Sequence, residues 1–254
     1  MKNELLTIGS FTIHGYGLMI GLGFACAYLL TDYRARKRQM NADLVFSLFV
    51  SSVVCGMLGA KLFYYITILD EILADPGVIL DRTEGFVVYG GIIAGILGGY
   101  AVCKWKKENF WKYFDLVAPA IALAQGFGRI GCLLAGCCYG KETDSALSIT
   151  FHDSKFAPNG VALIPTQIYS SLLDFLNFAV LIYIAKKAEK DRIVAGCYLI
   201  FYSIGRFLLE FLRGDLIRGN VGVLSTSQFI SIFILAAGVI LTASSHLDRE
   251  KTTA

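Results

Sequence analysis

Long apolar stretches separated by short polar segments dominate the pattern of this chain. Each stretch approaches the roughly 20 residues that an α-helix needs to cross the hydrocarbon core of a bilayer. The pattern therefore predicts an all-α, polytopic membrane protein with about seven transmembrane helices. The expected spans are 16–33, 44–66, 86–103, 113–134, 162–185, 193–212 and 224–244.

Basic residues are concentrated in alternate polar segments. They gather in 34–38 after the first span, in 104–112 between the third and fourth, and in 186–192 between the fifth and sixth. The positive-inside rule assigns such segments to the cytoplasm. We therefore expect the N-terminus outside, the C-terminus in the cytoplasm, and one integral membrane domain over 1–254. The polar segment 141–161 is then expected to form an extracytoplasmic loop element.

Composition agrees with a membrane protein and excludes one class of partner. Of the 254 residues, 56% are hydrophobic and 17% are charged, against about 25% charged residues in soluble domains. The net charge is only +3, and topology already explains the basic clusters. No nucleic acid is therefore expected as a partner, whereas the lipid bilayer is.

The apolar stretch Gln125–Gly140 contains an arginine, Arg129. An arginine at membrane depth costs roughly 3 kcal/mol on insertion scales, so it marks a site facing the protein interior or a cavity. The predicted topology places Arg129 in the outer half of the membrane. The sixth span brings Arg206, Glu210 and Arg213 to the same depth.

Spacings of four and three residues put Arg206, Glu210 and Arg213 on one helix face. An internal ion pair that lets the span insert explains Glu210 nearly as well as a functional role does. One glutamate between two arginines still leaves a positive surplus, which Arg129 increases. Guanidinium groups bind phosphate in a bidentate manner, so the surplus favours an anionic ligand such as a lipid phosphate.

Other polar or small residues are expected at this depth from further helices. Tyr16 opens the first span, Gln167 the fifth, and Tyr89-Gly90-Gly91 the third. Tyr89 also fits an interfacial aromatic belt, and the glycines fit close helix packing. Gln167 needs a polar partner within the membrane.

Three of the seven cysteines, Cys132, Cys137 and Cys138, lie in the same stretch as Arg129. A structural zinc site requires four ligands, and the three histidines have no supporting spacing. A redox pair would join Cys132 to one of the two adjacent cysteines. Helix packing is the favoured interpretation, and neither a metal nor a cofactor is expected.

A series of motifs along nearly the whole chain resembles the bacterial phosphatidylglycerol–prolipoprotein diacylglyceryl transferase family. Each motif is weak alone, but their order and spacing together are specific. They are HGYGLMIGLGFACAYLL at 14–30, GAKLFYY at 59–65, YGGIIAG at 89–95, GRIGCLLAGCCYG at 128–140, PTQIYSSLLD at 165–174 and GRFLLEFLRGD at 205–215.

The resemblance implies an enzyme that transfers the diacylglyceryl group of phosphatidylglycerol to the lipobox cysteine thiol of a preprolipoprotein signal peptide. It implies a place in the bacterial cytoplasmic (inner) membrane, with the active site toward the outer leaflet. The implied catalytic residues are Arg129, Arg206, Glu210 and Tyr89. The implied phosphatidylglycerol-binding residues are Arg129, Arg206, Tyr16, Gly90, Gly91, Gly140 and Gln167.

This sequence departs from the family pattern at the residues that would handle protons. Tyr89 stands where well-studied members have histidine, Cys132 where they have asparagine, Cys137 where they have glutamate, and Ile164 where a second histidine precedes the proline. Tyrosine has an ordinary pKa near 10 and is a poor base at neutral pH. The sequence therefore leaves the proton acceptor open.

Two other functions remain at this stage. The first is a related membrane enzyme that uses a polar lipid with another acceptor, or that gives the cysteines a thiol or redox role. The second is a lipid or solute transporter, which ranks last because transporter folds often contain internal repeats and none is visible.

Overall fold

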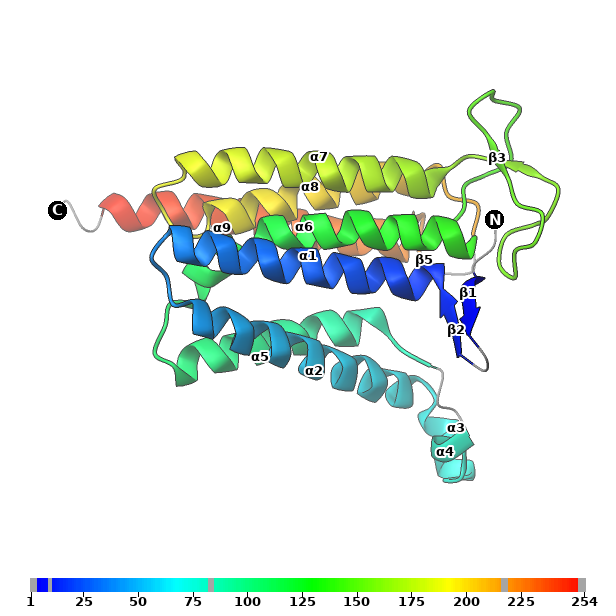
Figure 1. Cartoon of the computed structure of the whole chain (residues 1–254), viewed down its shortest axis with the longest axis horizontal. Coiled ribbons are helices and arrows are strands. Elements are labelled where there is room, and N and C mark those ends of the chain that lie inside the picture. The colour runs from blue at the N-terminus through cyan, green and yellow to red at the C-terminus, as the bar shows by residue number, and fades with distance from the viewer. Residues whose placement is uncertain (1–3, 9–10, 82–84, 216–218, 251–254) are drawn as a thin grey trace. The chain divides into compact units, whose positions relative to one another are not determined.

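The computed structural model describes residues 4–8, 11–81, 85–215 and 219–250 of the chain. Within them, seven helices are long and apolar enough to cross a membrane, which confirms the predicted polytopic all-α class. The side of the membrane on which each terminus lies stays a prediction. Four of the basic residues that count toward it lie outside the described residues: Lys2, Arg82, Arg218 and Lys251. The helices are α1 (Gly15–Lys37), α2 (Ala42–Thr67), α5 (Val88–Trp105), α6 (Phe110–Ala135), α7 (Thr166–Lys187), α8 (Ile193–Glu210) and α9 (Thr226–Glu250) (Figure 1).

Two of the differences between predicted and observed boundaries affect the site. The fifth span begins at Thr166, because residues Ala162–Leu163 form strand β4 and Pro165 precedes the helix. Proline lacks the N–H that a helix interior needs and disfavours helical geometry in the residue before it. The sixth span ends at Glu210, so Arg213 lies in the turn after α8 and not on its helical face.

The chain folds into two compact units. The first contains α1 as far as Thr31 and the chain from Trp111 onward, and its long helices run side by side (Figure 1). Apolar side chains of α6, α7 and α8 form its buried core. They are Ala118, Ala122, Leu181, Ala185, Val194 and Tyr198.

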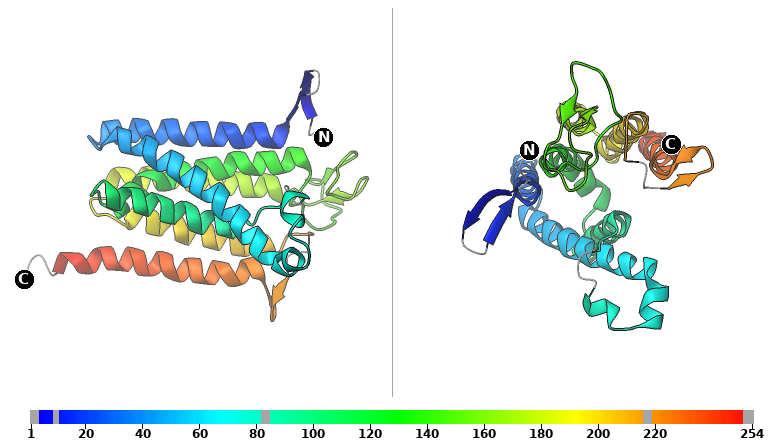
Figure 2. Two further views of the ribbon diagram at one scale, coloured as in Figure 1. Left: turned by 90° about the horizontal axis from the view of Figure 1, so that it is seen from below. Right: turned by 90° about the vertical axis from the view of Figure 1, so that its right-hand side faces the viewer.

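Short antiparallel strand pairs gather at one end of the first unit (Figure 2). They are β1 (Glu4–Ile8) with β2 (Phe11–His14), β3 (Ile149–Thr150) with β4, and β5 (Asn220–Val221) with β6 (Leu224–Ser225). Residues 141–161 thus form a loop element that contains β3. Its place outside the cytoplasm stays a prediction, as does the single-domain description of 1–254.

A buried carboxylate connects α6 to the first turn of α8. The Oδ1 atom of Asp115 accepts a hydrogen bond of 2.7 Å from the backbone N–H of Ala195. The first N–H groups of a helix have no partner within the helix, so a carboxylate there stabilises the helix end and its dipole.

The second unit, residues 32–110, is a pair of closely packed helices, α2 and α5, with the short helices α3 (Leu69–Ala74) and α4 (Val78–Asp81). Glycine is required where the two helices meet. A Cβ atom on Gly90 would lie 2.5 Å from the Phe63 side chain and 2.7 Å from the carbonyl oxygen of Gly59. Gly90 therefore has a packing role, and its predicted role in substrate binding stays a prediction.

Large apolar side chains are exposed along the helices, as a lipid-facing surface requires. Leu29 is 64% exposed, Leu176 60% and Phe233 60%. So much apolar helix surface would be a liability in water but is neutral against lipid tails. The protein is a multi-pass membrane protein.

Candidate active site

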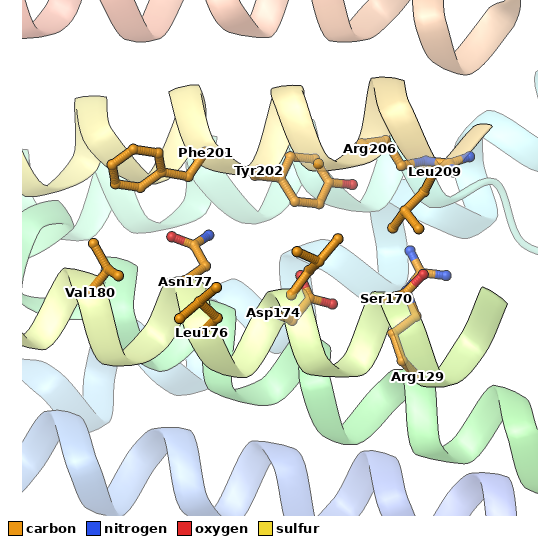
Figure 3. Close-up of a pocket in the computed structure, with 12 residues that line it drawn as sticks. Arg129, Ser170, Asp174, Leu176, Asn177, Val180, Phe201, Tyr202, Arg206 and Leu209 are labelled. Atoms are coloured by element: carbon orange, nitrogen blue, oxygen red, sulfur yellow. The ribbon is translucent and has the colours of Figure 1, made fainter. Parts of the chain in front are cut away.

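A cavity of about 200 Å³ opens among α6, α7 and α8 of the first unit (Figure 3). Successive turns of α7 line it, because residues three and four apart share one helix face. The wall combines charged and polar side chains with apolar ones, as an amphiphilic ligand requires. The lining residues are Arg129, Ser170, Leu173, Asp174, Leu176, Asn177, Val180, Phe201, Tyr202, Gly205, Arg206 and Leu209.

Arg129 points from α6 toward α8 (Figure 3). Within the described part of the chain, its guanidinium makes no hydrogen bond and no ion pair. It interacts electrostatically with Cys132, Asp174 and Tyr202. A largely desolvated cation needs a compensating partner. Arg129 therefore offers its donors to an anion that enters the cavity.

Arg206, by contrast, is held by two protein partners. Its Nη1 atom lies 2.7 Å from Oε2 of Glu210, and its Nη2 atom donates to Oγ of Ser227 on α9 at 2.7 Å. Arg213 Nε lies 3.9 Å from the same Glu210 oxygen. One carboxylate thus lies between two arginines, as predicted, although Arg213 approaches it from the turn after α8.

The cysteine stretch ends α6 in a Schellman motif. Gly136 has a left-handed φ of +74°, its N–H bonds to the Leu133 carbonyl at 3.2 Å, and the Cys137 N–H bonds to the Cys132 carbonyl at 3.1 Å. This motif brings the side chains five residues apart against each other. Cys132 and Cys137 therefore become neighbours as a consequence of how the helix ends.

Hydrogen bonds from the start of α7 fix the loop that follows. Thr166 Oγ1 donates to the Cys138 carbonyl and Gln167 Nε2 to the Cys137 carbonyl, each at 2.8 Å. Gln167 is only 1% exposed, so this carbonyl is the polar partner that its place in the membrane required. Cys138 itself adopts a left-handed φ of 60°, which is unusual for a residue other than glycine.

Gly140 connects this loop to the turn after α8. Its N–H bonds to the Ile164 carbonyl at 3.0 Å, and it forms an antiparallel bridge with Arg213. A Cβ atom on Gly140 would lie 2.5 Å from the Ile164 oxygen and 2.9 Å from the Leu212 oxygen. Only glycine fits, which explains structurally why the motif ends on this residue.

The loop gathers three thiols. The sulfur atoms of Cys132, Cys137 and Cys138 all lie within 4.8 Å of one another, and none of them forms a disulfide. Hydrogen bonds with the Cys132 and Cys137 thiols, together with the positive charge of Arg213, lower the pKa of Cys138. Tyr16 of α1 interacts electrostatically with all three cysteines and with Arg129.

Comparison with known proteins identifies the family. The sequence model of the family described as prolipoprotein diacylglyceryl transferase matches residues 3–244. A phosphatidylglycerol–prolipoprotein diacylglyceryl transferase of Clostridium tetani is 47% identical over 95% of this chain and 96% of its own. Another of Clostridium perfringens is 50% identical over the whole of this chain and 99% of its own.

The chain belongs to the prolipoprotein diacylglyceryl transferase family. The resemblance predicted from the motifs is thereby confirmed, together with an enzymatic, transferase function. The similarity spans nearly the full length of the relatives, a Finegoldia magna transferase at 35% identity included.

The structure brings most of the residues expected from the transferase family into the first unit. Arg129 and Arg206 line one cavity, and Glu210 pairs with Arg206. Tyr16, Gly140 and Gln167 surround the cysteine loop. Tyr89, Gly90 and Gly91 belong to α5 in the second unit, where Tyr89 is 43% exposed. Their roles in a transferase reaction stay predictions.

Sequence reasoning missed several residues of the cavity. Asp174, Asn177 and Tyr202 line it beside the arginines, and Ser227 holds Arg206 from α9. A signal for the first two was present, because polar residues inside the fifth span recur at helical spacing with Gln167. Tyr202 could also have been found, because it lies four residues before Arg206 and shares its helix face. Nothing in the sequence marked Ser227, on another helix, as a partner of Arg206.

Proposed function

We propose that this transferase moves the diacylglyceryl group of phosphatidylglycerol to the lipobox cysteine thiol of preprolipoprotein signal peptides. The observation that carries the proposal is Arg129, a desolvated guanidinium without an ion-pair partner in the described chain, in one cavity with Arg206. The names of the similar relatives support these substrates.

The two arginines fit the charge of the lipid headgroup. The phosphodiester carries one negative charge, which Arg129 can bind in a bidentate manner. Arg206 adds charge but keeps a fixed orientation, because Glu210 and Ser227 hold it. Glu210 thus acts as a positioning residue for Arg206.

The rest of the cavity wall suits the glycerol backbone and the first parts of the acyl chains. Leu173, Leu176, Val180 and Phe201 supply apolar surface. Asn177 is 8% exposed, and neither polar atom of its amide has a hydrogen-bond partner in the described chain. A buried unpaired amide is costly, so an ester carbonyl of the bound lipid is a suitable partner.

The reaction is a displacement at carbon. The thiolate sulfur attacks the glyceryl CH₂ group that carries the phosphate, a C–S bond forms, and the C–O bond breaks. Glycerol phosphate leaves with the electron pair, and Arg129 and Arg206 stabilise the charge that develops on its oxygens. The catalytic role of Tyr89 that the family resemblance implies stays a prediction.

The membrane side completes the proposal. The distribution of basic residues favours α6 and α8 running outward, with Arg129 and Arg206 toward the outer leaflet of the bacterial cytoplasmic membrane. Phosphatidylglycerol and a translocated signal peptide would then meet at the end of the first unit that carries the strand pairs.

Purified protein in vesicles with labelled phosphatidylglycerol and a lipobox peptide tests the proposal. We expect a peptide product that carries the diacylglyceryl mass. Arg129→Ala should lower kcat/KM by about 100-fold or more, the loss usual for one preorganised charge donor. Arg36→Ala is the control, because that arginine's side chain is 68% exposed. A folded wild-type preparation that lipidates no peptide contradicts the proposal.

A further inference from the structure

We propose that Cys132, Cys137 and Cys138 bind a zinc ion whose fourth coordination position takes the sulfur of the acceptor cysteine. The inference rests on the transferase function proposed above and adds to it a metal site and a source of the nucleophile. The geometry of the cysteine loop carries it.

The three sulfurs are already near the arrangement that zinc requires. Zinc–thiolate bonds of about 2.3 Å in a tetrahedral site place sulfurs about 3.8 Å apart. In this loop no two of the three are more than 4.8 Å apart. Small side-chain rotations that move the sulfur atoms by no more than about one ångström would therefore give them the spacing of a zinc site.

The backbone that presents the sulfurs is fixed before any ion binds. The Schellman motif sets Cys132 against Cys137, and Thr166 and Gln167 hold the carbonyls of Cys138 and Cys137. A left-handed Cys138 in the next position directs a third thiol to the same point. Backbone strain of this kind persists where the surroundings over-determine it, and it gathers at functional sites.

The number of ligands favours a catalytic site over a structural one. Structural zinc sites are closed by four protein ligands, whereas catalytic sites have three and keep one open position. In the described chain, no histidine, aspartate, glutamate or fourth cysteine joins this group. The sequence-based expectation of no metal considered only a structural site with four protein ligands. Three converging thiols are enough for a catalytic site, which has three protein ligands and one open position.

The charges around the loop suit such a complex. Zinc with three thiolates carries one negative charge, and a fourth thiolate makes it two. Arg213 and Arg129 interact with the cysteines and offset that charge. Arg213 is also paired with Asp215, because its Nε donates a hydrogen bond of 2.8 Å to Asp215 Oδ1. From α1, Tyr16 places a hydroxyl near the three cysteines.

Coordination to zinc would deprotonate the acceptor thiol, a task for which Tyr89 is unsuited because tyrosine is a poor base at neutral pH. A free cysteine with a pKa near 8.5 is only about 3% thiolate at pH 7, and a metal-coordinated thiol is deprotonated outright. The proton passes to water as the substrate sulfur coordinates. That sulfur then attacks the glyceryl carbon, glycerol phosphate leaves with the C–O electron pair, and the neutral thioether, a weaker ligand, dissociates.

Metal content and a cobalt spectrum test the site without relying on activity. We expect about one zinc ion per chain in protein purified without chelator, and loss of that zinc in Cys137→Ala. In the cobalt-substituted protein, thiolate-to-cobalt absorption should change when a lipobox peptide is added. A peptide with serine in place of the cysteine should cause no change. Cys197→Ala, from α8 and outside the group, is the control that keeps zinc.

Activity provides the second arm. Removing zinc with a chelator, or Cys137→Ala, should lower the rate of transfer at pH 7 by roughly 30-fold, because only about 3% of a free cysteine is thiolate at that pH. The loss should shrink as pH rises toward the thiol pKa, whereas a folding defect would not be relieved in this way. Added zinc should restore the chelated enzyme but not the variant.

Three outcomes would overturn the site: full transfer by zinc-free enzyme, zinc retained by Cys137→Ala, or thiol titration that shows a disulfide among the three cysteines. The transferase function would survive each of them. Conversely, an enzyme that binds zinc and shows the peptide-dependent cobalt spectrum, yet forms no lipidated peptide, would refute the proposed reaction while supporting the metal site.

Discussion

Arg129 and Arg206 border the same cavity, but their surroundings give them different tasks. Arg206 is held by Glu210 and Ser227, whereas Arg129 has no hydrogen-bond or ion-pair partner in the described residues. Removing one member of a buried ion pair leaves the other charge uncompensated, which costs several kcal/mol. Removing an unpaired cation has no such cost. Substitution of Arg206 should therefore lower both stability and activity, whereas substitution of Arg129 should lower activity alone.

Arg206→Ala should lower both activity and the free energy of unfolding, by about 2–3 kcal/mol because Arg213 remains near Glu210. Arg129→Ala should lower activity at unchanged or increased stability. Thermal unfolding in detergent, measured beside peptide lipidation, checks both. The double variant Arg206→Ala/Glu210→Gln should recover stability without recovering activity. Recovery of activity in that variant would show that Arg206 is only structural.

Asn177 provides a second test at this scale. Asn177→Leu removes an amide whose polar atoms have no partner in the described chain, so the folded protein should be as stable or more stable. If the amide binds an ester carbonyl of the lipid, KM for phosphatidylglycerol should rise about 5-fold, the value of one ordinary hydrogen bond. A lipid titration measures it, and an unchanged KM excludes the contact.

Among the elements, the end of α6 most directly couples local folding to the site. Gly136 allows the left-handed residue of the Schellman motif, and that motif places Cys132 beside Cys137. The juxtaposition could be predicted from the sequence, since a glycine after an apolar helix signals this ending. The third thiol could not, because it depends on a left-handed Cys138 and on hydrogen bonds from α7.

Gly136→Ala should cost about 1–2 kcal/mol of stability, the penalty for a side chain in left-handed geometry. It should also lower peptide transfer, because a Cβ there would lie 2.3 Å from Ser154 Oγ and displace the loop. Gly160→Ala is a matched control, with a φ of +78° and no heavy atom within 4 Å of its Cβ. It should lose similar stability and keep its transfer rate. If Gly136→Ala and Gly160→Ala lost transfer rate equally, the cysteine loop would have no specific role in the reaction.

For the whole molecule, the sequence predicted what depends on local composition and missed what depends on packing. The seven spans follow from apolar length alone, so they were predicted within a few residues. The start of α7 was wrong because Ala162 and Leu163 pair with β3, a contact between distant segments. The joint cavity of Arg129 and Arg206 agrees with the predicted depth of both, whereas the hydrogen bond from Arg206 to Ser227 depends on how α8 and α9 pack.

Packing between α2 and α5 gives a prediction for the second unit. A Cβ on Gly59 would lie 2.2 Å from the Ala94 side chain, so Gly59→Leu should separate the helices and lower stability by several kcal/mol. Gly21→Leu, in α1 with open space around it, should be neutral or stabilising. Thermal unfolding in detergent compares the two, and equal midpoints would contradict the close packing.

The pairing of residues 139–141 with 212–214 has a consequence for biogenesis. The backbone N–H of Lys141 donates to the Leu212 carbonyl at 2.9 Å, and the backbone N–H of Gly214 donates to the Tyr139 carbonyl at 3.1 Å. The ribosome completes the cysteine loop two helices before it makes these partners, so in a nascent chain residues 139–141 have no backbone partner and the adjoining thiols are more accessible. We expect a chain arrested within α8 to be modified by a small thiol reagent faster than the finished protein. The thiol site is thus one of the last parts of this enzyme to mature.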